Sequence, residues 1–437
     1  MNRHSVAALF AALVVGPAVA EADDWPRFRG PAGSGVASGP AVPFTWSDTE
    51  NLRWKQPLPG AGSSSPIVVG DRVIVTCYSG YGVPGERDGE ASRLERHVLC
   101  LQRSSGDELW RKTVPAQQPE DPDRGFLTEH GYASSTPVSD GERLYVLLGK
   151  SGVFALDLKS GAELWQADVG RESSDRQWGS ASSPVLHGDL LIVNASEESQ
   201  SLRAFDKRTG EPVWKQESSR LNLAYNTPVV VDGPGGRPEL LVGTAGGEGL
   251  GPGELWSLNP ANGKLRWYAQ VPLERNVSPS VQVGGGVAYL YGGRPNASAA
   301  VRLGGRGDVT DANTVWTKRT GSYVASPLLH AGHLYWVSDQ GLAVCQSAAT
   351  GDEVYQKRLR FSTGGRPVYA SPVLSGGRLI VPTRYDGVFV YPATPEFEQP
   401  VVNRFASDES MFNASPAVSD GELYLRSDTT LYCVAAN

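Results

Sequence analysis

Hydrophobic and polar residues alternate along short segments of this chain, and turn sequences separate the segments. Residues 133–165, ASSTPVSDGERLYVLLGKSGVFALDLKSGAELW, show the pattern once, with apolar runs on both sides of the turns Asp140-Gly141 and Ser160-Gly161. Period-two alternation broken by such turns is typical of antiparallel strands joined by hairpins. The segment therefore predicts one four-stranded antiparallel sheet, which must stack on further copies to bury its faces.

The same unit recurs along the chain, and each copy begins with a Ser-Pro or Thr-Pro pair. The pairs follow one another at intervals of roughly 45 residues after the first copy, a spacing that is typical of propeller blades. We therefore predict an all-β fold, an eight-bladed β-propeller of four-stranded antiparallel blades. The pairs are Ser65-Pro66, Thr136-Pro137, Ser183-Pro184, Thr227-Pro228, Ser278-Pro279, Ser326-Pro327, Ser371-Pro372 and Ser415-Pro416.

Both ends of the repeat region contain an incomplete copy. The last copy, residues 415–437, stops one strand short of a blade, and residues 51–60, NLRWKQPLPG, resemble a final strand with no copy before it. Pairing the two ends would close the ring without an exposed inner edge. We predict that an N-terminal strand completes the C-terminal blade, with residues 21–50 as a lead-in and residues 51–437 as one propeller domain.

Most copies end on an aromatic residue, and in five copies a turn glycine precedes that position by four residues. A glycine there fits a left-handed backbone conformation, and burial of the aromatic side chain stabilises the fold by about 1.5–3 kcal/mol. We therefore predict a buried aromatic residue at the end of each copy except the seventh, which has no clear counterpart. The aromatic residues are Trp54, Trp110, Trp165, Trp214, Trp267, Trp316 and Tyr355, and the glycines are Gly106, Gly161, Gly210, Gly263 and Gly351.

The first residues resemble a secretory signal peptide. Arg3 and His4 precede an apolar run at residues 6–15, and Ala18-Val19-Ala20 fits the cleavage pattern. The run is shorter than the roughly 20 apolar residues of a membrane-spanning helix. We therefore predict that residues 1–20 are removed and that the protein is exported, to the periplasm or the exterior, without a transmembrane segment.

Composition and charge narrow the choice of partner. The chain has 437 residues, 51 glycines, 31 prolines and a net charge of -7. This composition indicates a turn-rich globular protein, and its acidic balance offers no basic stripe for a phosphate backbone. We predict a monomer that does not bind nucleic acid.

Two glycine-rich motifs resemble phosphate-binding loops. Residues 80–85 spell G-x-G-x-x-G, but no helix is predicted after them, as a dinucleotide site would require. Gly149-Lys150-Ser151 lacks the first glycine of a phosphate loop and is predicted to be a hairpin turn. Neither motif predicts a nucleotide site.

The cysteines predict packing rather than chemistry. Cys100, Cys345 and Cys433 occupy the slot that small residues hold in other copies, and Cys77 lies one strand away from Cys100. The sequence does not decide whether Cys77 and Cys100 form a disulfide, because the strand register sets the distance between the two cysteines.

Three acidic residues, Glu120, Asp121 and Asp123, are the candidate ligands for calcium. Gly125 stands where a calcium loop needs another acid, so a solvated acidic loop is the favoured interpretation. No zinc motif, nucleophile elbow or catalytic triad is visible in the sequence. We predict no metal, no cofactor and no catalytic residues.

Two long insertions interrupt the first copy, at residues 79–96 and 115–131. By strand parity both emerge on one face of the ring, and long loops on a rigid scaffold often carry binding sites. On that face, residues just before the Ser-Pro and Thr-Pro pairs converge on the channel mouth and form a predicted binding funnel. Packing of blade against blade is the alternative, because a pocket also needs convergent polar groups. The predicted funnel residues are His130, Tyr132, Trp178, Tyr225, Asn276, Arg294, Tyr323, Tyr369, Arg384 and Phe412, with Arg275 at the same rim.

The segments GVFALDLKSGAELW (152–165) and SLRAFDKRTGEPVW (201–214) resemble the repeat of pyrroloquinoline-quinone-type propellers. The resemblance covers nearly all of the chain after the predicted signal peptide. It implies one of two kinds of protein, a quinoprotein dehydrogenase or a non-catalytic propeller such as the lipoprotein scaffold of the outer-membrane β-barrel assembly machinery. The dehydrogenases carry a disulfide between adjacent cysteines, and no two cysteines are adjacent here.

We therefore expect an exported, non-catalytic binding or scaffolding propeller whose funnel face binds a protein or peptide of the cell envelope. One alternative is a dehydrogenase that uses pyrroloquinoline quinone with calcium. A further alternative is a carbohydrate-binding propeller, since exposed aromatic side chains also stack on sugars.

Overall fold

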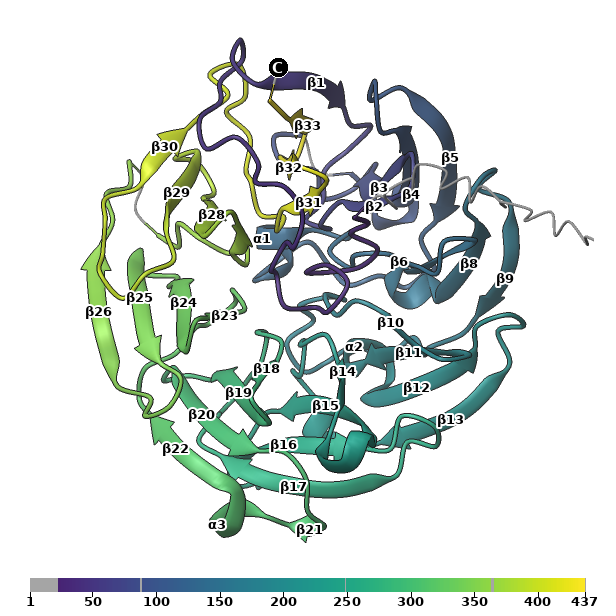
Figure 1. Cartoon of the computed structure of the whole chain (residues 1–437). Helices are drawn as coiled ribbons and strands as arrows, with labels where there is room; N and C mark the ends of the chain where they lie inside the picture. The colour runs from purple at the N-terminus through teal and green to yellow at the C-terminus, as the bar shows by residue number, and fades with distance from the viewer. Residues whose placement is uncertain (1–22, 87–88, 248, 363–364, 437) are drawn as a thin grey trace, which may run out of the picture.

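The strands form a closed ring of eight sheets around a central channel (Figure 1). The computed structural model describes residues 23–86, 89–247, 249–362 and 365–436. Within these residues each sheet is a four-stranded antiparallel blade, and blade 4 gains a short fifth strand. The predicted eight-bladed all-β propeller is confirmed.

The strands of each blade are given from the channel outwards. Blade 1 contains β2 (Ile67–Val69), β3 (Arg72–Ser79), β4 (Glu95–Gln102) and β5 (Glu108–Pro115), and blade 2 contains β6 (Val138–Ser139), β7 (Arg143–Leu147), β8 (Val153–Asp157) and β9 (Glu163–Ala167). Blade 3 contains β10 (Val185–His187), β11 (Leu190–Ala195), β12 (Ser201–Asp206) and β13 (Pro212–Glu217), and blade 4 contains β14 (Val229–Asp232), β15 (Pro238–Thr244), β16 (Gly253–Leu258), β17 (Leu265–Val271) and β21 (Gly307–Asp308).

Blade 5 contains β18 (Gln282–Gly284), β19 (Val287–Gly292), β20 (Ala297–Arg302) and β22 (Thr314–Lys318), and blade 6 contains β23 (Leu328–His330), β24 (His333–Val337), β25 (Leu342–Ser347) and β26 (Glu353–Arg358). Blade 7 contains β27 (Val373–Ser375), β28 (Arg378–Pro382), β29 (Val388–Pro392) and β30 (Val401–Asn403), and blade 8 contains β31 (Ala417–Ser419), β32 (Glu422–Arg426), β33 (Thr430–Val434) and β1 (Leu52–Pro57). Short helical turns connect some strands: η1 (Ala91–Arg93), α1 (Leu127–His130), η2 (Gly149–Ser151), α2 (Ser196–Ser199), η3 (Ser219–Leu221), η4 (Pro234–Gly236) and α3 (Thr310–Asn313).

The two ends of the chain meet in blade 8. Strand β1 pairs antiparallel with β33, and Trp54 lies opposite Cys433. The predicted closure of the ring is therefore confirmed. At the seam with blade 1, Glu422 forms ion pairs with Arg53 and Arg103, and Arg103 Nε lies 2.6 Å from the Glu422 carboxylate.

Conserved spacing within the repeats produces one contact between neighbouring blades. The ring of Trp110 packs over Gly161 of the next blade, and its Nε1 donates a hydrogen bond to the carbonyl of Leu158, 3.1 Å away. Gly161 adopts φ +70°, so the turn and the close approach both require glycine. The same arrangement joins Trp54 to Gly106, Trp165 to Gly210, Trp214 to Gly263 and Trp316 to Gly351.

The register of the strands explains where the cysteines lie and why two of them are not bonded. Cys100 lies opposite Trp110, as Ala155 lies opposite Trp165, so the predicted small-residue slot is confirmed. Cys77 lies opposite His97, whereas Cys100 lies opposite Ile74, three residues along the same strand. All four cysteines are free and buried, so the Cys77–Cys100 disulfide is not formed.

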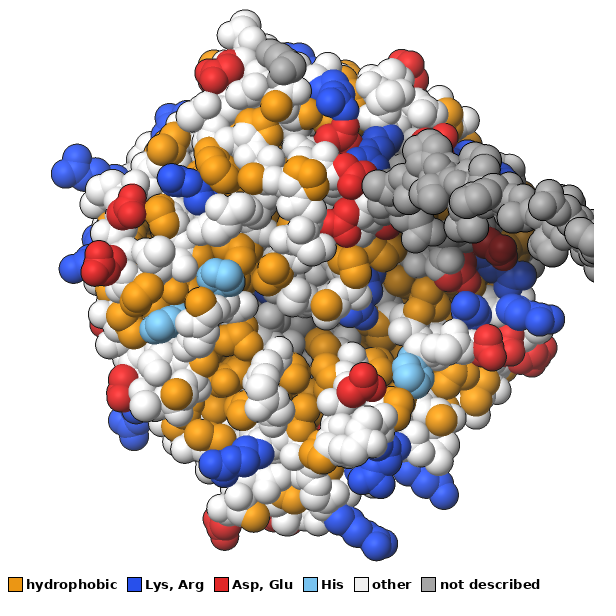
Figure 2. Space-filling model, in the orientation of Figure 1, with side chains coloured by type: hydrophobic (Ala, Val, Ile, Leu, Met, Phe, Trp, Pro, Cys, Tyr) orange, Lys and Arg blue, Asp and Glu red, His pale blue; other side chains and the backbone are white. Residues whose placement is uncertain are grey.

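The lead-in crosses the channel on one face of the ring, where it appears purple in Figure 1. Trp25 pairs with Val68 of blade 1, and Val36 forms a bridge with Leu374 of blade 7. Arg29 lies between these contacts, fully buried, and donates hydrogen bonds to the carbonyls of Ser326 and Pro327. On this face the charged side chains project mainly from the periphery (Figure 2).

The predicted signal peptide lies outside the described residues. Within residues 23–436, with the gaps given above, no helix is long and apolar enough to cross a membrane. Residues 80–85 form a loop after β3 and are not followed by a nucleotide-binding helix, and Gly149–Ser151 is a turn between β7 and β8, as predicted.

Candidate functional site

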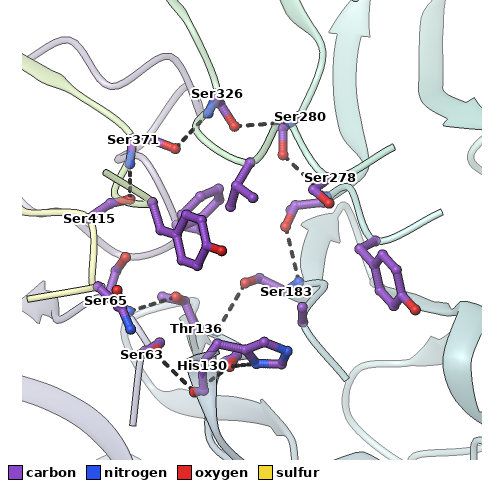
Figure 3. Close-up of a pocket in the computed structure, with 18 of the residues that line it drawn as sticks. Ser63, Ser65, His130, Thr136, Ser183, Ser278, Ser280, Ser326, Ser371 and Ser415 are labelled. Atoms are coloured by element: carbon purple, nitrogen blue, oxygen red, sulfur yellow. Dashed lines mark hydrogen bonds between the residues drawn. The ribbon is translucent and has the colours of Figure 1, made fainter. Parts of the chain in front are cut away.

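Eight buried hydroxyl groups surround the middle of the channel, one from each blade. At seven of the eight positions the backbone N–H donates to the hydroxyl of the next blade, with N···O distances of 2.9–3.2 Å. In Figure 3 the circle can be followed along the dashed bonds through the labelled residues Ser65, Thr136, Ser183, Ser280, Ser326, Ser371 and Ser415. We call it the hydroxyl ring: Ser65, Thr136, Ser183, Thr227, Ser280, Ser326, Ser371 and Ser415.

In blade 5 the ring residue is Ser280 rather than Ser278 of the predicted Ser278-Pro279 pair. Ser280 accepts from Thr227 N–H at 3.2 Å and stands two residues before β18, as Thr227 stands two residues before β14. The proline motif therefore predicted the start of this blade two residues too early. Ser278 still lines the channel.

The channel contains a cavity of about 160 Å³ between the lead-in and the second insertion. Phe28 of the lead-in lines it together with the hydroxyl ring, and Phe126 lines it from the second insertion. Six of the predicted funnel residues also line the cavity, namely His130, Trp178, Tyr225, Asn276, Tyr323 and Tyr369.

Aromatic rings form the wall of the cavity toward the insertions. The Phe126 ring lies 4.5 Å from Trp178 in an edge-to-face arrangement and 5.9 Å from Tyr323. Trp178 in turn stacks on Tyr225 at 6.1 Å. Such a wall offers flat apolar surface to a ligand at low conformational cost.

Three guanidinium groups lie among these rings. Arg294 is 4.2 Å from the Tyr323 ring centre, and Arg366 is 4.4 Å from that of Phe126, both within cation–π range. Arg384 lies 5.0 Å from the Tyr369 ring and forms an ion pair of 2.7 Å with Glu129. Arg294 and Arg384 thus lie at the rim, beside the cavity rather than in its lining.

Two other predicted funnel residues do not reach the cavity. Tyr132 is buried against Tyr78 and Tyr81, and its hydroxyl donates to the carbonyl of Asp121 at 2.8 Å. Phe412 stacks in a cluster with Phe405 and Tyr432. For these two residues the structure agrees with packing between blades. Arg275 is exposed and is not among the residues that line the cavity.

Helix α1 closes part of the mouth. His130 Nε2 donates to the carbonyl of Trp178 at 2.8 Å, and Asn413 Nδ2 donates to the carbonyl of Glu129 at 2.7 Å. Burial lowers the pKa of His130, so its imidazole is neutral near pH 7. The helix is therefore held by blades 3, 7 and 8, and His130 adds no positive charge to the mouth.

The acidic segment of the second insertion is buried, contrary to the predicted solvated loop. Glu120 forms an ion pair with Arg96, and Asp121 forms one of 2.9 Å with Lys150, the lysine of the turn at residues 149–151. These contacts pair each acid with a cation, which offsets the cost of burial. Across the described part of the chain no group of His, Cys, Asp and Glu is arranged to hold a metal ion.

Two further carboxyl groups lie behind the aromatic wall, on α2. Glu197 accepts hydrogen bonds from the hydroxyls of Ser174, at 2.9 Å, and Tyr225, at 3.1 Å. Burial, and then the charge of Glu197, raise the pKa of Glu198 to about 8. This buried polar network positions Tyr225 and with it the Trp178 ring.

The cavity lining does not fit a quinone held by calcium. Glu129 is the one carboxylate among the lining residues, and Arg384 already pairs with it. A calcium ion takes six to eight oxygen ligands, with carboxylates prominent among them. The lining instead combines aromatic rings, hydroxyls and nearby guanidiniums, a donor set that suits an anion.

Sequence reasoning missed Phe28, Phe126 and Arg366. Phe126 lies inside an insertion that was predicted to carry function, so its aromatic character was the available signal. Arg366 lies in the loop between β26 and β27, and no motif of the repeat indicates its position. Phe28 reaches the cavity from the opposite face, and no repeat pattern indicates that the lead-in enters the channel.

Comparison with known proteins matches the chain to one family and to several individual relatives. The model of a family described as outer membrane protein assembly factor BamB matches residues 94–357. The BamB protein of Burkholderia pseudomallei is 25% identical over 373 residues, which are 76% of this chain and 84% of that protein. Quinoprotein alcohol dehydrogenase PedH of Pseudomonas putida is 28% identical over 172 residues, which are 38% of this chain but 26% of that protein. The match thus spans about a quarter of the dehydrogenase.

Solved structures of a BamB protein and of a methanol dehydrogenase share the fold. BamB from Moraxella catarrhalis has a TM-score of 0.59 at 17% identity, covering 87% of this chain and 96% of that chain. A europium-containing methanol dehydrogenase has a TM-score of 0.62 at 12% identity, covering 94% and 97%. At these identities the likeness shows the propeller architecture alone.

Proposed function

The chain belongs to the outer membrane protein assembly factor BamB family, and from this premise we propose that it is an exported, non-catalytic scaffold that binds a protein partner of the cell envelope on its funnel face. We define the funnel face as the channel mouth formed by Phe126, Trp178, Arg294, Tyr323 and Arg366. The match to BamB over most of both chains supports a scaffolding role.

One observation carries the proposal, the gathering of aromatic and guanidinium groups at the channel mouth. Arg294 and Arg366 lie over the rings of Tyr323 and Phe126, and all four side chains come from loops or strand ends on one face. Aromatic residues and arginine are enriched where protein interfaces have their strongest contacts. A partner segment with aromatic and acidic side chains fits this surface.

Site-specific photo-crosslinking in the bacterial envelope tests the proposal. A photoreactive phenylalanine analogue is placed at Phe126 or at Arg366, and the same analogue at His330 probes the opposite face. We expect a discrete adduct with one envelope protein from positions 126 and 366 and none from position 330. The adduct from position 366 should fall at least fivefold when Trp178→Ala and Arg294→Ala are combined.

A matched double variant on the lead-in face, His330→Ala with Arg378→Ala, serves as the control and should leave the adduct unchanged. Adducts from position 330 alone would move the binding surface to the other face. Equal adducts with and without the Trp178→Ala and Arg294→Ala changes would show that the rim does not bind the partner.

The second candidate function is a quinone-dependent dehydrogenase, which the match to PedH favours. Purified protein mixed with pyrroloquinoline quinone and calcium would then retain the quinone absorbance through gel filtration and oxidise alcohols with a dye acceptor. Because the cavity lining offers no calcium ligand set, we expect neither result. Retention of the quinone together with dye reduction would replace the scaffolding proposal.

A further inference from the structure

The hydroxyl ring has donor capacity that the protein does not use. Each ring oxygen accepts a backbone N–H, apart from the position where the circle of bonds is open between Ser415 and Ser65. Among the described residues, none of the eight hydroxyls donates a hydrogen bond to a protein atom. Because a hydroxyl carries one proton in addition to its lone pairs, these O–H groups face the cavity as donors.

A buried positive charge lies directly behind the ring. The guanidinium of Arg29 donates to the carbonyls of Ser34, Ser326 and Pro327 at 2.7–3.0 Å, and no carboxylate pairs with it in the described part of the chain. Burial lowers the pKa of Arg29 to about 9, so it remains charged near pH 7. An uncompensated buried cation favours an anion nearby.

The other end of the cavity is also cationic. Arg294 and Arg366 lie over aromatic rings, and neither forms an ion pair with a described carboxylate. The one acid of the lining, Glu129, is neutralised by Arg384. The cavity therefore lies between positive groups at both ends, with hydroxyl donors between them.

We propose that the channel binds one small oxyanion at the hydroxyl ring, either the carboxylate of a small organic acid or an inorganic sulfate or phosphate. The anion oxygens accept hydrogen bonds from several ring hydroxyls and from Ser278, whose hydroxyl has no partner in the ring. A cavity of about 160 Å³ has room for an anion of this size and for accompanying water. Entry is from the mouth, because Phe28 of the lead-in lines the opposite end.

This site lies below the rim and goes beyond the proposed function. Partner docking uses Trp178 and Arg366 at the mouth, whereas the anion is held by hydroxyls that a folded partner does not reach. Loss of anion binding with unchanged crosslinking would separate the two, as would the reverse result.

Isothermal titration calorimetry on the purified protein tests the proposal, with acetate, succinate, sulfate and phosphate at constant ionic strength in sodium chloride. We expect one-to-one binding of at least one of them with Kd below about 1 mM. Acetamide, the neutral counterpart of acetate, should bind at least tenfold more weakly. Preference for the carboxylates or for sulfate and phosphate then identifies the source of the oxyanion.

Two variants remove hydroxyl donors from the cavity lining. Thr136→Val combined with Thr227→Val deletes two hydroxyls while keeping the side-chain shape, and Ser278→Ala deletes one that takes no part in the ring bonds. Each should weaken anion binding by at least tenfold, whereas Thr314→Val, on the outer strand β22, should leave the affinity unchanged. Because Ser278→Ala breaks no structural hydrogen bond, it keeps the test valid if the double variant does not fold.

No saturable heat with any of the four anions would overturn the proposal, since the channel would then hold water only. Equal affinity in wild type and in Ser278→Ala, with equal affinity in any folded double variant, would place the anion outside the channel and overturn it as well.

Discussion

The contact between a tryptophan and a glycine of the next blade shows how single residues assemble this ring. At Gly161 an added Cβ would lie 2.5 Å from Trp110 Cε3, closer than non-bonded carbons approach. The glycine is therefore required for the docking of two blades as well as for its own turn. The spacing of these residues predicted a buried aromatic and a tight turn, but which blade the aromatic contacts depends on three-dimensional packing.

Substitution Gly161→Ala separates the two requirements. We expect the free energy of unfolding to fall by about 2–4 kcal/mol, because alanine is strained in the left-handed backbone and because its Cβ displaces the Trp110 ring. Gly141→Ala is the matched control, because Gly141 has φ +91° and no heavy atom within 4 Å of the added Cβ. It should cost about 1–2 kcal/mol. Urea unfolding measures both, and equal losses would contradict the role of the contact.

The buried carboxyl of Glu198 predicts a pH dependence of stability. Its pKa is about 8 in the folded protein and 4.5 as the ordinary value, so between these the folded state keeps a proton that the unfolded chain releases. Stability should therefore fall as pH rises from about 5 to 8, by up to about 1.4 kcal/mol per pH unit from this group.

The variant Glu198→Gln cannot release this proton, so its urea midpoint should fall less than that of the wild type between pH 5.5 and 8. Glu172→Gln, an exposed neighbour, should keep the wild-type slope. Parallel slopes for Glu198→Gln and the wild type would assign the pH dependence to other groups.

At the scale of elements, the insertions of blade 1 are the parts that the repeat does not determine. Their lengths and strand parity predicted that both emerge on one face, and the hydrogen bond from the Asp123 N–H to the Tyr81 hydroxyl, 3.0 Å, agrees with this. The burial of Glu120 and Asp121 was not predictable, because their partners Arg96 and Lys150 come from strand β4 and the turn η2. An acidic segment is predicted to be exposed when the cations that pair with it in the folded chain are not known.

Helix α1 is held over the mouth by few contacts, and Glu129 makes the one ion pair among them. In Glu129→Ala the link to Arg384 is lost, so amide exchange of residues 126–131 should quicken at least threefold in hydrogen–deuterium exchange measurements. Glu86→Ala, an exposed acid of the other insertion, is the control and should leave these amides unchanged. Unaltered exchange in Glu129→Ala would mean that the hydrogen bonds of His130 and Asn413 are enough to hold α1 over the mouth.

At the scale of the whole molecule, the sequence predicted blade number, strand order and ring closure, because every blade obeys the same local pattern. Features that occur once were not predictable, among them the passage of Arg29 into the floor of the channel. The start of blade 5 shows the limit of the pattern, since Ser278-Pro279 imitates the motif while Ser280 occupies the structural position. Repetition therefore determines the scaffold, and single contacts between distant segments determine the candidate site.

Closure of the ring depends on the seam where Glu422 pairs with Arg53 and Arg103. In Glu422→Gln both pairs are lost, and we expect a cost of about 2–3 kcal/mol, below the roughly 3–5 kcal/mol of a fully buried pair because Arg53 is 42% exposed. Exchange should quicken first in β1 and β33. Glu163→Gln breaks the exposed pair with Lys112 and should cost at most about 1 kcal/mol. Equal costs for the two variants would show that the seam is not a weak point of the ring.

The pairing of β1 with β33 also sets the order of events during biosynthesis. Leu52 and Val434, which lie opposite each other, are separated by nearly the whole length of the chain. At about 5–20 residues per second, β1 waits on the order of 20–80 seconds for its partner to be made. Blades 1 to 7 can form in succession during that time, but blade 8 cannot. The finished ring is therefore a product of the released chain.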